Sequence, residues 1–246
     1  MQSDGYFDKR VAATYDDDVS FDAPEAVEPV VDFLTELADG GRVLEFGIGT
    51  GRIALPLAMQ GVEVHGIDLS QAMLTKLAEK TGGDRISVTQ GDFATALCEG
   101  SFSLVYLIFN TIMNLTTQDE QVKCFQNAAS HLDPGGSFVI EVMVPALQHI
   151  PFGETNRVFE FRDDHWGIDT YDVVSQQLTS HHFRIRDGQT ELSSIPFRYV
   201  WPSELDLMAK IAHLTLKARW GGWKKEAFTN LSRHHVSVWE KPCNSH

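Results

Sequence analysis

The chain has 246 residues and a formal net charge of −14 at pH 7, from 20 Lys and Arg against 34 Asp and Glu. This excess of acids disfavours a nucleic-acid partner, because binding to phosphates depends on clustered basic side chains. Three widely spaced cysteines fit neither a disulfide framework nor a paired zinc site, and no apolar run approaches the ~20 residues that span a bilayer. We therefore expect a cytoplasmic globular protein, monomer or homodimer, that binds no nucleic acid, membrane or metal.

The first half of the chain alternates between helical and extended patterns. Apolar residues recur at steps of three and four over 24–38, which predicts a helix that Gly40 and Gly41 end. Short apolar runs and helical periods then alternate at a pitch typical of a doubly wound parallel sheet. The predicted strands are 42–46, 62–67, 86–88, 104–109 and 138–144, and the predicted helices are 52–59, 70–80 (capped by Ser70) and 118–132.

The pattern changes after Pro145. Residues 157–201 alternate without a helical period, which indicates antiparallel strands joined near Asp187-Gly188. The apolar residues of both arms have odd numbers, so a two-residue loop would place them on opposite faces, and we expect a three- or five-residue loop or a bulge. The inward face should then carry His181 and Tyr199, with His182 turned outward. A helix over 203–213 and strands over 214–220 and 234–240 complete the chain.

A glycine-rich turn joins the first predicted strand to the next helix, with Gly47, Gly49 and Gly51 at alternate positions. Glycines there let the backbone pass close to a ligand and leave amide donors pointing at it. A dinucleotide fingerprint needs a small residue at position 52, where this chain has Arg52. Glu45 lies two residues before the first glycine, where it would repel a pyrophosphate and suits a ligand that carries positive charge.

Two further acids follow the next predicted strands. Asp68 can accept both hydroxyls of a ribose, and Gly66 is expected to clear space beside the ligand. Asp92 can accept from an exocyclic amine, next to Phe93, which can cover a purine face. All of these strand ends lie at the carboxyl edge of the sheet, where open α/β folds bind their ligands. The sequence therefore predicts a site for a nucleoside with a cationic tail.

These motifs, in this order, resemble those of the class I S-adenosylmethionine-dependent methyltransferases. The resemblance covers about residues 10–144 and extends to the last helix and two strands. It implies a doubly wound α/β fold with a mostly parallel seven-stranded sheet, its last strand antiparallel, and an antiparallel β insertion after strand five. The matching motifs are Leu44-Glu45-x-Gly47-x-Gly49-x-Gly51, Gly66-Ile67-Asp68-x-Ser70-x-x-Met73-Leu74, Gly91-Asp92-Phe93 and Leu132-x-Pro134-Gly135-Gly136.

The resemblance also implies roles for individual residues toward S-adenosylmethionine. Glu45 and the turn over 47–51 would hold the methionine part, Asp68 the ribose hydroxyls and Asp92 the adenine amine. The other residues expected at the cofactor are Tyr15, which would close over it, Arg52, Leu69, Met73, Phe93, Phe109 and Asn110.

Two motifs of other branches of the family are missing from this sequence, which limits the classes of substrate to be expected. The stretch 110–113 lacks both the Asn-Pro-Pro-aromatic run of nucleic-acid amino-methyltransferases and the Asp of metal-dependent catechol-type enzymes. What remains is similar to the aminosugar and amino-acid N-methyltransferases, so we expect metal-independent N- or O-methylation of a small metabolite. His181, Tyr199 or Glu141 could accept a proton. Two alternatives stay open: an NAD(P)-dependent oxidoreductase, and a module that binds S-adenosylmethionine without turnover.

We accordingly expect three parts in the chain. Residues 1–40 form a helical N-terminal cap, and residues 41–145 with 202–246 form the cofactor-binding α/β domain. Residues 146–201 form the antiparallel insertion that walls the substrate. The run Asp16–Asp18 is expected to be a solvated face.

Overall fold

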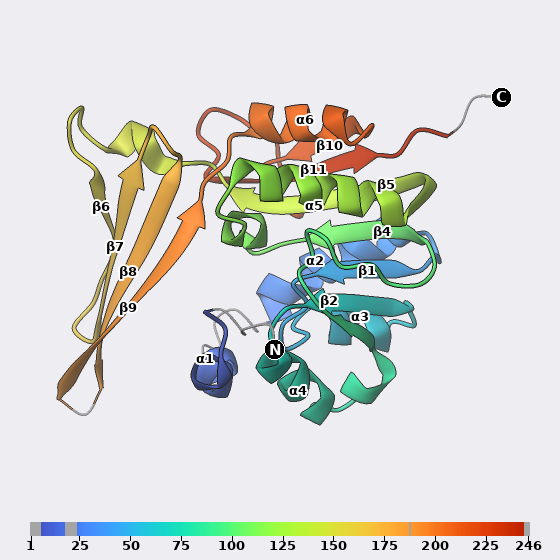
Figure 1. Ribbon diagram of the computed structural model, residues 1–246, viewed down its shortest axis with the longest axis horizontal. Helices are drawn as coiled ribbons and strands as arrows, with labels where there is room; N and C mark the ends of the chain where they lie inside the picture. The colour runs from blue at the N-terminus through green and yellow to red at the C-terminus, as the bar shows by residue number, and fades with distance from the viewer. Residues whose placement is uncertain (1–5, 18–23, 187, 244–246) are drawn as a thin grey trace.

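The computed structural model describes residues 6–17, 24–186 and 188–243. Its centre is a seven-stranded sheet in the order β10-β11-β5-β4-β1-β2-β3 (Figure 1). Strand β11 runs antiparallel to both of its neighbours, and the remaining pairs among β1 to β5 are parallel. The predicted fold class is confirmed. The strands are β1 (Val43–Phe46), β2 (Val64–Asp68), β3 (Ser87–Gln90), β4 (Phe102–Leu107), β5 (Leu132–Met143), β10 (Thr215–Trp220) and β11 (His234–Glu240).

Helices cover both faces of this sheet, and its central strands are therefore buried on both sides. One apolar cluster joins the sheet to α5 (Gln118–His131) and α6 (Pro202–Ile211). The other joins it to α2 (Pro24–Ala38), α3 (Ala54–Met59) and α4 (Gln71–Glu79). None of the described helices has both the length and the apolar character that crossing a membrane requires.

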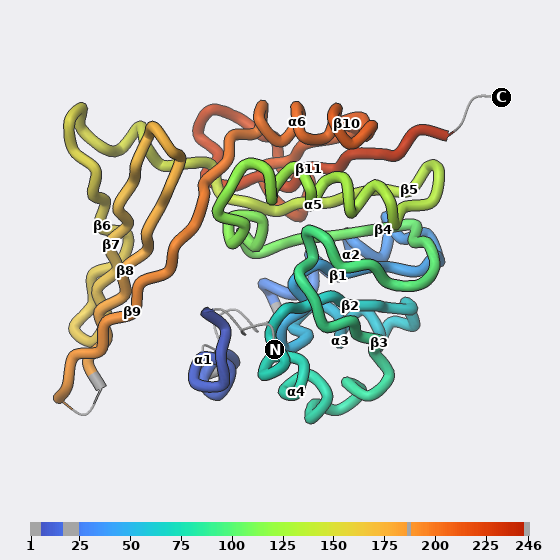
Figure 2. Tube along the Cα trace, in the orientation of Figure 1, coloured from blue at the N-terminus to red at the C-terminus, as the bar shows by residue number. Residues whose placement is uncertain are grey.

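A second sheet of four antiparallel strands follows β5 and the short helix η4 (Ala146–His149). Figure 2 shows the chain leaving the large sheet, building this second sheet beside it and returning through α6. The strands pair in sequence order, as expected of an insertion made of successive hairpins. They are β6 (Asn156–Phe161), β7 (His165–Asp172), β8 (Gln177–Arg186) and β9 (Gln189–Arg198).

The hairpin of β8 and β9 corrects the expected loop. Arg186 lies opposite Gln189, so only residues 187 and 188 lie between the paired strands, and the expected three- or five-residue loop is wrong. In this register Ser180 lies opposite Ile195 and His182 lies on their face, while His181 lies on the other face opposite Ser194. The error has a physical cause: both faces of β8 and β9 carry apolar residues, so alternation alone did not identify the buried face.

The N-terminal segment packs over the carboxyl edge of the large sheet. Helix α1 (Lys9–Thr14) is followed by the short helix η1 (Tyr15–Asp17), and Ala12 packs in a cluster with Ala72 and Met73 of α4. The Thr50 hydroxyl donates to Asp16 at 2.7 Å, and Lys80 forms an ion pair with the same carboxylate at 2.9 Å. The expected solvated face is therefore wrong for Asp16, and Asp18 lies outside the described residues.

Candidate active site

The glycine turn after β1 runs past the edge of the sheet with positive φ at its three glycines, +69° at Gly47, +55° at Gly49 and +80° at Gly51. A Cβ on Gly47 would lie 2.7 Å from the Thr111 methyl group, so the turn has no room for a side chain there. Gly51 meets a different constraint, because a Cβ there would lie 2.4 Å from Leu77 of α4. Gly47 and Gly49 line cavities, whereas Gly51 is required for packing.

The carboxylate of Asp68 is held by backbone donors at the end of β2. It accepts from the Gly49 amide at 2.7 Å and from the Ser70 amide at 2.8 Å. Ser70 also caps α4 by accepting from the Met73 amide, as predicted. The expectation for Gly66 is wrong: a Cβ there would lie 2.2 Å from Ile48, so this glycine makes room for a core side chain rather than for a ligand.

A cavity of about 350 Å³ opens beside Asp68. Apolar side chains and acids both line it, which suits a purine nucleoside with its flat base and its hydroxyls. Eight of the residues expected at the cofactor line it: Tyr15, Gly47, Gly49, Asp68, Leu69, Met73, Asp92 and Phe93. Sequence reasoning missed further lining residues, including Tyr6, Phe7, Thr111, Leu115, Ile195 and Pro196, because they reach the cavity from distant segments.

A smaller cavity adjoins it under the glycine turn, where Glu45, Arg52 and Phe109 join Tyr15. Glu45 is buried and accepts from the Tyr106 hydroxyl at 2.8 Å. Burial, with a contribution from the charge of Asp68, raises the pKa of Glu45 to about 8. The Arg52 guanidinium lies 5.5 Å from the Tyr15 ring centre and 5.1 Å from that of Phe109.

The end of β4 turns sharply, with φ of +55° at Phe109 and +61° at Asn110. The Phe109 amide donates to the Glu141 carboxylate at 2.8 Å, and the Met143 amide donates to the side chain of Asn110 at 2.7 Å. Burial raises the pKa of Glu141. Phe109 lines the smaller cavity, but Asn110 lines neither cavity and instead ties the turn to β5. The cofactor roles of all these residues stay predictions.

None of the three residues suggested as proton acceptors, His181, Tyr199 and Glu141, lines the cofactor cavity. His181 bonds to the Ser194 hydroxyl at 2.8 Å, on the face of the insertion sheet opposite Ile195. Tyr199 is 1% exposed, and its ring packs 5.7 Å from that of Tyr171 in the core. The expected inward placement of His181 is wrong, because the two-residue hairpin reverses which positions share a face.

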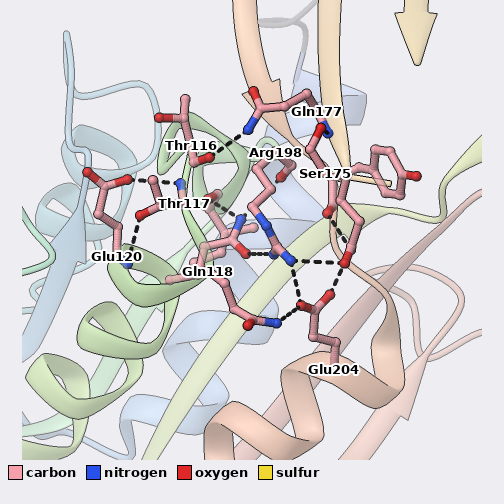
Figure 3. Close-up of polar contacts among 12 residues, drawn as sticks. Thr116, Thr117, Gln118, Glu120, Ser175, Gln177, Arg198 and Glu204 are labelled. Carbon is pink, nitrogen blue, oxygen red and sulfur yellow. Dashed lines mark hydrogen bonds and ion pairs between the residues drawn. The ribbon is translucent and has the colours of Figure 1, made fainter. Parts of the chain in front are cut away.

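A buried polar cluster ties the insertion sheet to the cofactor cavity (Figure 3). Arg198 at the end of β9 is 5% exposed and pairs with Glu204 of α6 at 2.7 Å. The side chain of Gln177 donates at 2.8 Å to the carbonyl of Thr116, a residue that lines the cavity. The position of the sheet beside the cavity therefore depends on these contacts, in which Gln118, Gln121 and Gln176 also take part.

Comparison with known proteins places this site in a family. A family model described as a methyltransferase domain matches residues 43–136. The CcbJ methyltransferase from Streptomyces caelestis is 36% identical in sequence, with a TM-score of 0.86 over 98% of this chain and 100% of that one. The chain belongs to the class I S-adenosylmethionine-dependent methyltransferases.

Two further methyltransferases are similar to this chain, one in sequence and one in structure. The cypemycin N-terminal methyltransferase of a Streptomyces species is 29% identical over 208 residues, which cover 82% of this chain and 84% of that protein. CalS10 from Micromonospora echinaspora, an amino pentose methyltransferase whose structure was solved with its cofactor bound, has a TM-score of 0.67 at 19% identity, over 88% and 90% of the two chains. The methyl donor of this methyltransferase is S-adenosylmethionine. The acidic and apolar walls of the cavity fit that cofactor.

Proposed function

We propose that this methyltransferase transfers its methyl group to an amine nitrogen of a small molecule, without a metal. The observation that carries the proposal is the outer wall of the cofactor cavity. Ile195 and Pro196 of the insertion sheet close one side, and Tyr6 and Phe7 of the N-terminal segment close another. A cofactor enclosed by the chain's own segments suits a small acceptor better than a duplex nucleic acid.

Two features favour an amine over a hydroxyl. The cypemycin N-terminal methyltransferase is named for methyl transfer at an N-terminus, and CalS10 is described as an amino pentose methyltransferase. The net charge of −14 also attracts an amine, which reaches the protein as an ammonium ion. We propose residues 146–201 as the wall that receives this acceptor.

The proposed roles of the residues are those that the motifs imply, and the positions of these residues around the two cavities support them. When bound, S-adenosylmethionine supplies an electrophilic methyl group on a sulfonium. The fixed carboxylate of Asp68 would orient the ribose, Asp92 would accept from the adenine amine, and Glu45 would hold the cationic amino group. Alignment of this kind can contribute about 7–11 kcal/mol to catalysis, so the protein's main task is to position the two reactants. An acceptor amine must also be neutral when it reacts, and its proton must leave the cleft.

The test combines binding with product analysis. Titration calorimetry with S-adenosylhomocysteine is expected to show a single site, and no binding at about 100 μM would contradict the cofactor assignment. The protein is then incubated with S-adenosylmethionine and trialanine, glucosamine, N-acetyl-trialanine or glucose. We expect methylated product from a free amine and none from its acetylated or hydroxyl counterpart. Methylation of glucose alone would overturn the amine proposal in favour of O-methylation.

A further inference from the structure

One face of the insertion sheet carries a row of apolar side chains that crosses all four strands. In the strand register, the residues opposite one another in this row are Phe161, Trp166, Phe183 and Leu192. Ile195, which lines the cofactor cavity, lies on the other face of the sheet. With two residues of the neighbouring rows, the row forms what we call the outer apolar face: Val158, Phe161, Trp166, Phe183, Ile185 and Leu192.

The two faces of the insertion sheet differ in burial. On the face of Ile195, the side chains of Asp169, Tyr171 and Ser180 are buried. On the outer apolar face, Phe161 is 78% exposed, and all the other members except the half-buried Phe183 are exposed as well. Figure 1 shows the sheet projecting beside the large sheet as a single layer. An apolar sheet face is normally buried against a second layer, so the outer apolar face lacks the layer that would cover it.

The composition of the outer apolar face resembles the centre of a protein interface. The rings of Phe161 and Trp166 are stacked, with their centres 6.0 Å apart and their planes 13° from parallel. Aromatic side chains that are already ordered lose little conformational freedom on binding, and tryptophan is enriched among the residues that contribute most to affinity. The exposed side chains of this face present on the order of 500 Å² of apolar surface, at the upper end of what a monomer exposes. A surrounding polar rim extends the contact to about 800 Å² per partner, the size of a standard interface.

We propose that the outer apolar face is the interface of a homodimer, in which the insertion sheets of two copies pack face to face about a twofold axis. Two sheets packed in this way lie about 10 Å apart, with the side chains of the two faces interdigitated. The partner's sheet then supplies the missing second layer. Ile195 and the cofactor cavity lie on the other side of each sheet, so the dimer does not depend on the proposed acceptor.

The distribution of charge favours a second copy as the partner. The chain has 34 acidic residues and a net charge of −14, yet the described positions of the outer apolar face include no Asp, Glu, Lys or Arg. The adjoining positions on this face are also without formal charge: His181, Thr190 and Ser194. A twofold contact places each surface against its own copy, so an acidic patch would repel itself and an uncharged one does not. A basic partner would instead be attracted to acidic surface, which this face lacks.

The edges of the insertion sheet indicate that the copies meet through faces and not by adding strands. The register of β6 shifts between Val158 and Glu160, as in a β-bulge. At the other edge, β9 contains Pro196, which has no amide to donate. Bulges and prolines on edge strands prevent pairing with a further strand. The face is therefore the part of this sheet that can receive a partner.

Two leucines with the same exposed fraction provide a matched pair of variants. Leu192 on the outer apolar face and Leu207 on α6 are both 59% exposed. Sedimentation velocity of the full chain at about 50 μM is expected to give twice the chain mass of 27.5 kDa. Leu192→Glu should weaken dimerisation at least about tenfold, because it places a charge in an apolar contact, and Leu207→Glu should leave it unchanged. Both variants should bind S-adenosylhomocysteine as the wild type does, which shows that they are folded. A monomeric wild type, or equal dimerisation of the two variants, would overturn the proposal.

A second measurement locates the interface in the wild type, without a variant. Hydroxyl-radical oxidation is compared at about 0.5 and 50 μM protein, with the concentrations chosen to bracket dissociation of the dimer. Phe161 and Trp166 are expected to be protected at the higher concentration, while Met59 of α3, which is 85% exposed, is oxidised equally at both. A dimer in which Phe161 and Trp166 stay reactive would place the interface elsewhere and refute the assignment. Protection that requires phosphatidylcholine vesicles would assign the face to a lipid surface and equally refute the homodimer.

Discussion

Asp68 joins two parts of the fold through one carboxylate, at the position where we propose that it binds the ribose. Its two oxygens accept from the amides of Gly49 and Ser70, so the carboxylate is fixed before any ligand arrives. Asp68→Ala is expected to weaken S-adenosylhomocysteine binding by about 2 kcal/mol or more, roughly 30-fold. Calorimetric titration measures this loss, with Asp84→Ala, at an exposed position of the short helix η2 (Gly83–Arg85), as the control. Unchanged affinity would remove the proposed ribose role of Asp68.

Glu45 is expected to make cofactor binding depend on pH. Its pKa is raised to about 8 in the free protein, so the carboxyl is mostly protonated at pH 7. A cationic amino group bound beside it favours the carboxylate and lowers this pKa, so binding releases a proton. By linkage, affinity should increase as pH rises from about 6 to 8 and level off above that. Calorimetry in phosphate and Tris buffers at pH 7 detects the released proton. Glu45→Gln should abolish the difference between the buffers, and a wild type without that difference would contradict the role.

At the scale of elements, the insertion sheet depends on the buried pair of Arg198 and Glu204. Replacing Arg198 leaves the charge of Glu204 without its ion-pair partner, so Arg198→Met is expected to destabilise the protein by about 3 kcal/mol. Arg198→Met combined with Glu204→Leu should recover part of this loss. The midpoint of urea unfolding reports both effects. The matched control is Arg162→Met, which breaks the more exposed pair with Glu160 and should change stability by less than about 0.5 kcal/mol. Equal effects of the two arginine variants would contradict this account.

The N-terminal segment shows a second dependence between elements. The Ser70 hydroxyl donates to the carbonyl of Phe7, and Lys80 and Thr50 both contact Asp16. These contacts hold α1 and Tyr15 against the carboxyl edge of the sheet. Nothing in residues 6–17 alone indicates this, because the partners lie 34 to 64 positions away along the chain.

At the scale of the whole molecule, the net charge of −14 disfavours binding to nucleic acids. A fluorescently labelled RNA or DNA duplex is expected to show no change in anisotropy with this protein even at about 20 mM salt, where phosphate contacts are strongest. Saturable binding that weakens as salt increases would contradict the expectation of a small acceptor. Binding of S-adenosylhomocysteine by the same protein sample in the same buffer is the control that the protein is folded.

Most of the large sheet could be predicted from the sequence, because its signals are local. Helix α2 begins and ends at the predicted residues 24 and 38, and β11 spans the predicted 234–240. The acids and glycines at the ends of β1, β2 and β3 were found for the same reason, since each lies next to its own strand. The faces of the insertion sheet were not found, because a difference of one residue in a hairpin loop exchanges them.

The sequence by itself determined the order of strands and helices, the glycine turn and the acids that meet at the carboxyl edge, since chain direction brings parallel strand ends together. Only the tertiary structure decided that Gly66 makes room for Ile48, that His182 rather than His181 shares a face with Ile195, and that Tyr6 lines the cofactor cavity. These features depend on strand register and on packing between distant segments, and such contacts leave no periodic pattern along the chain.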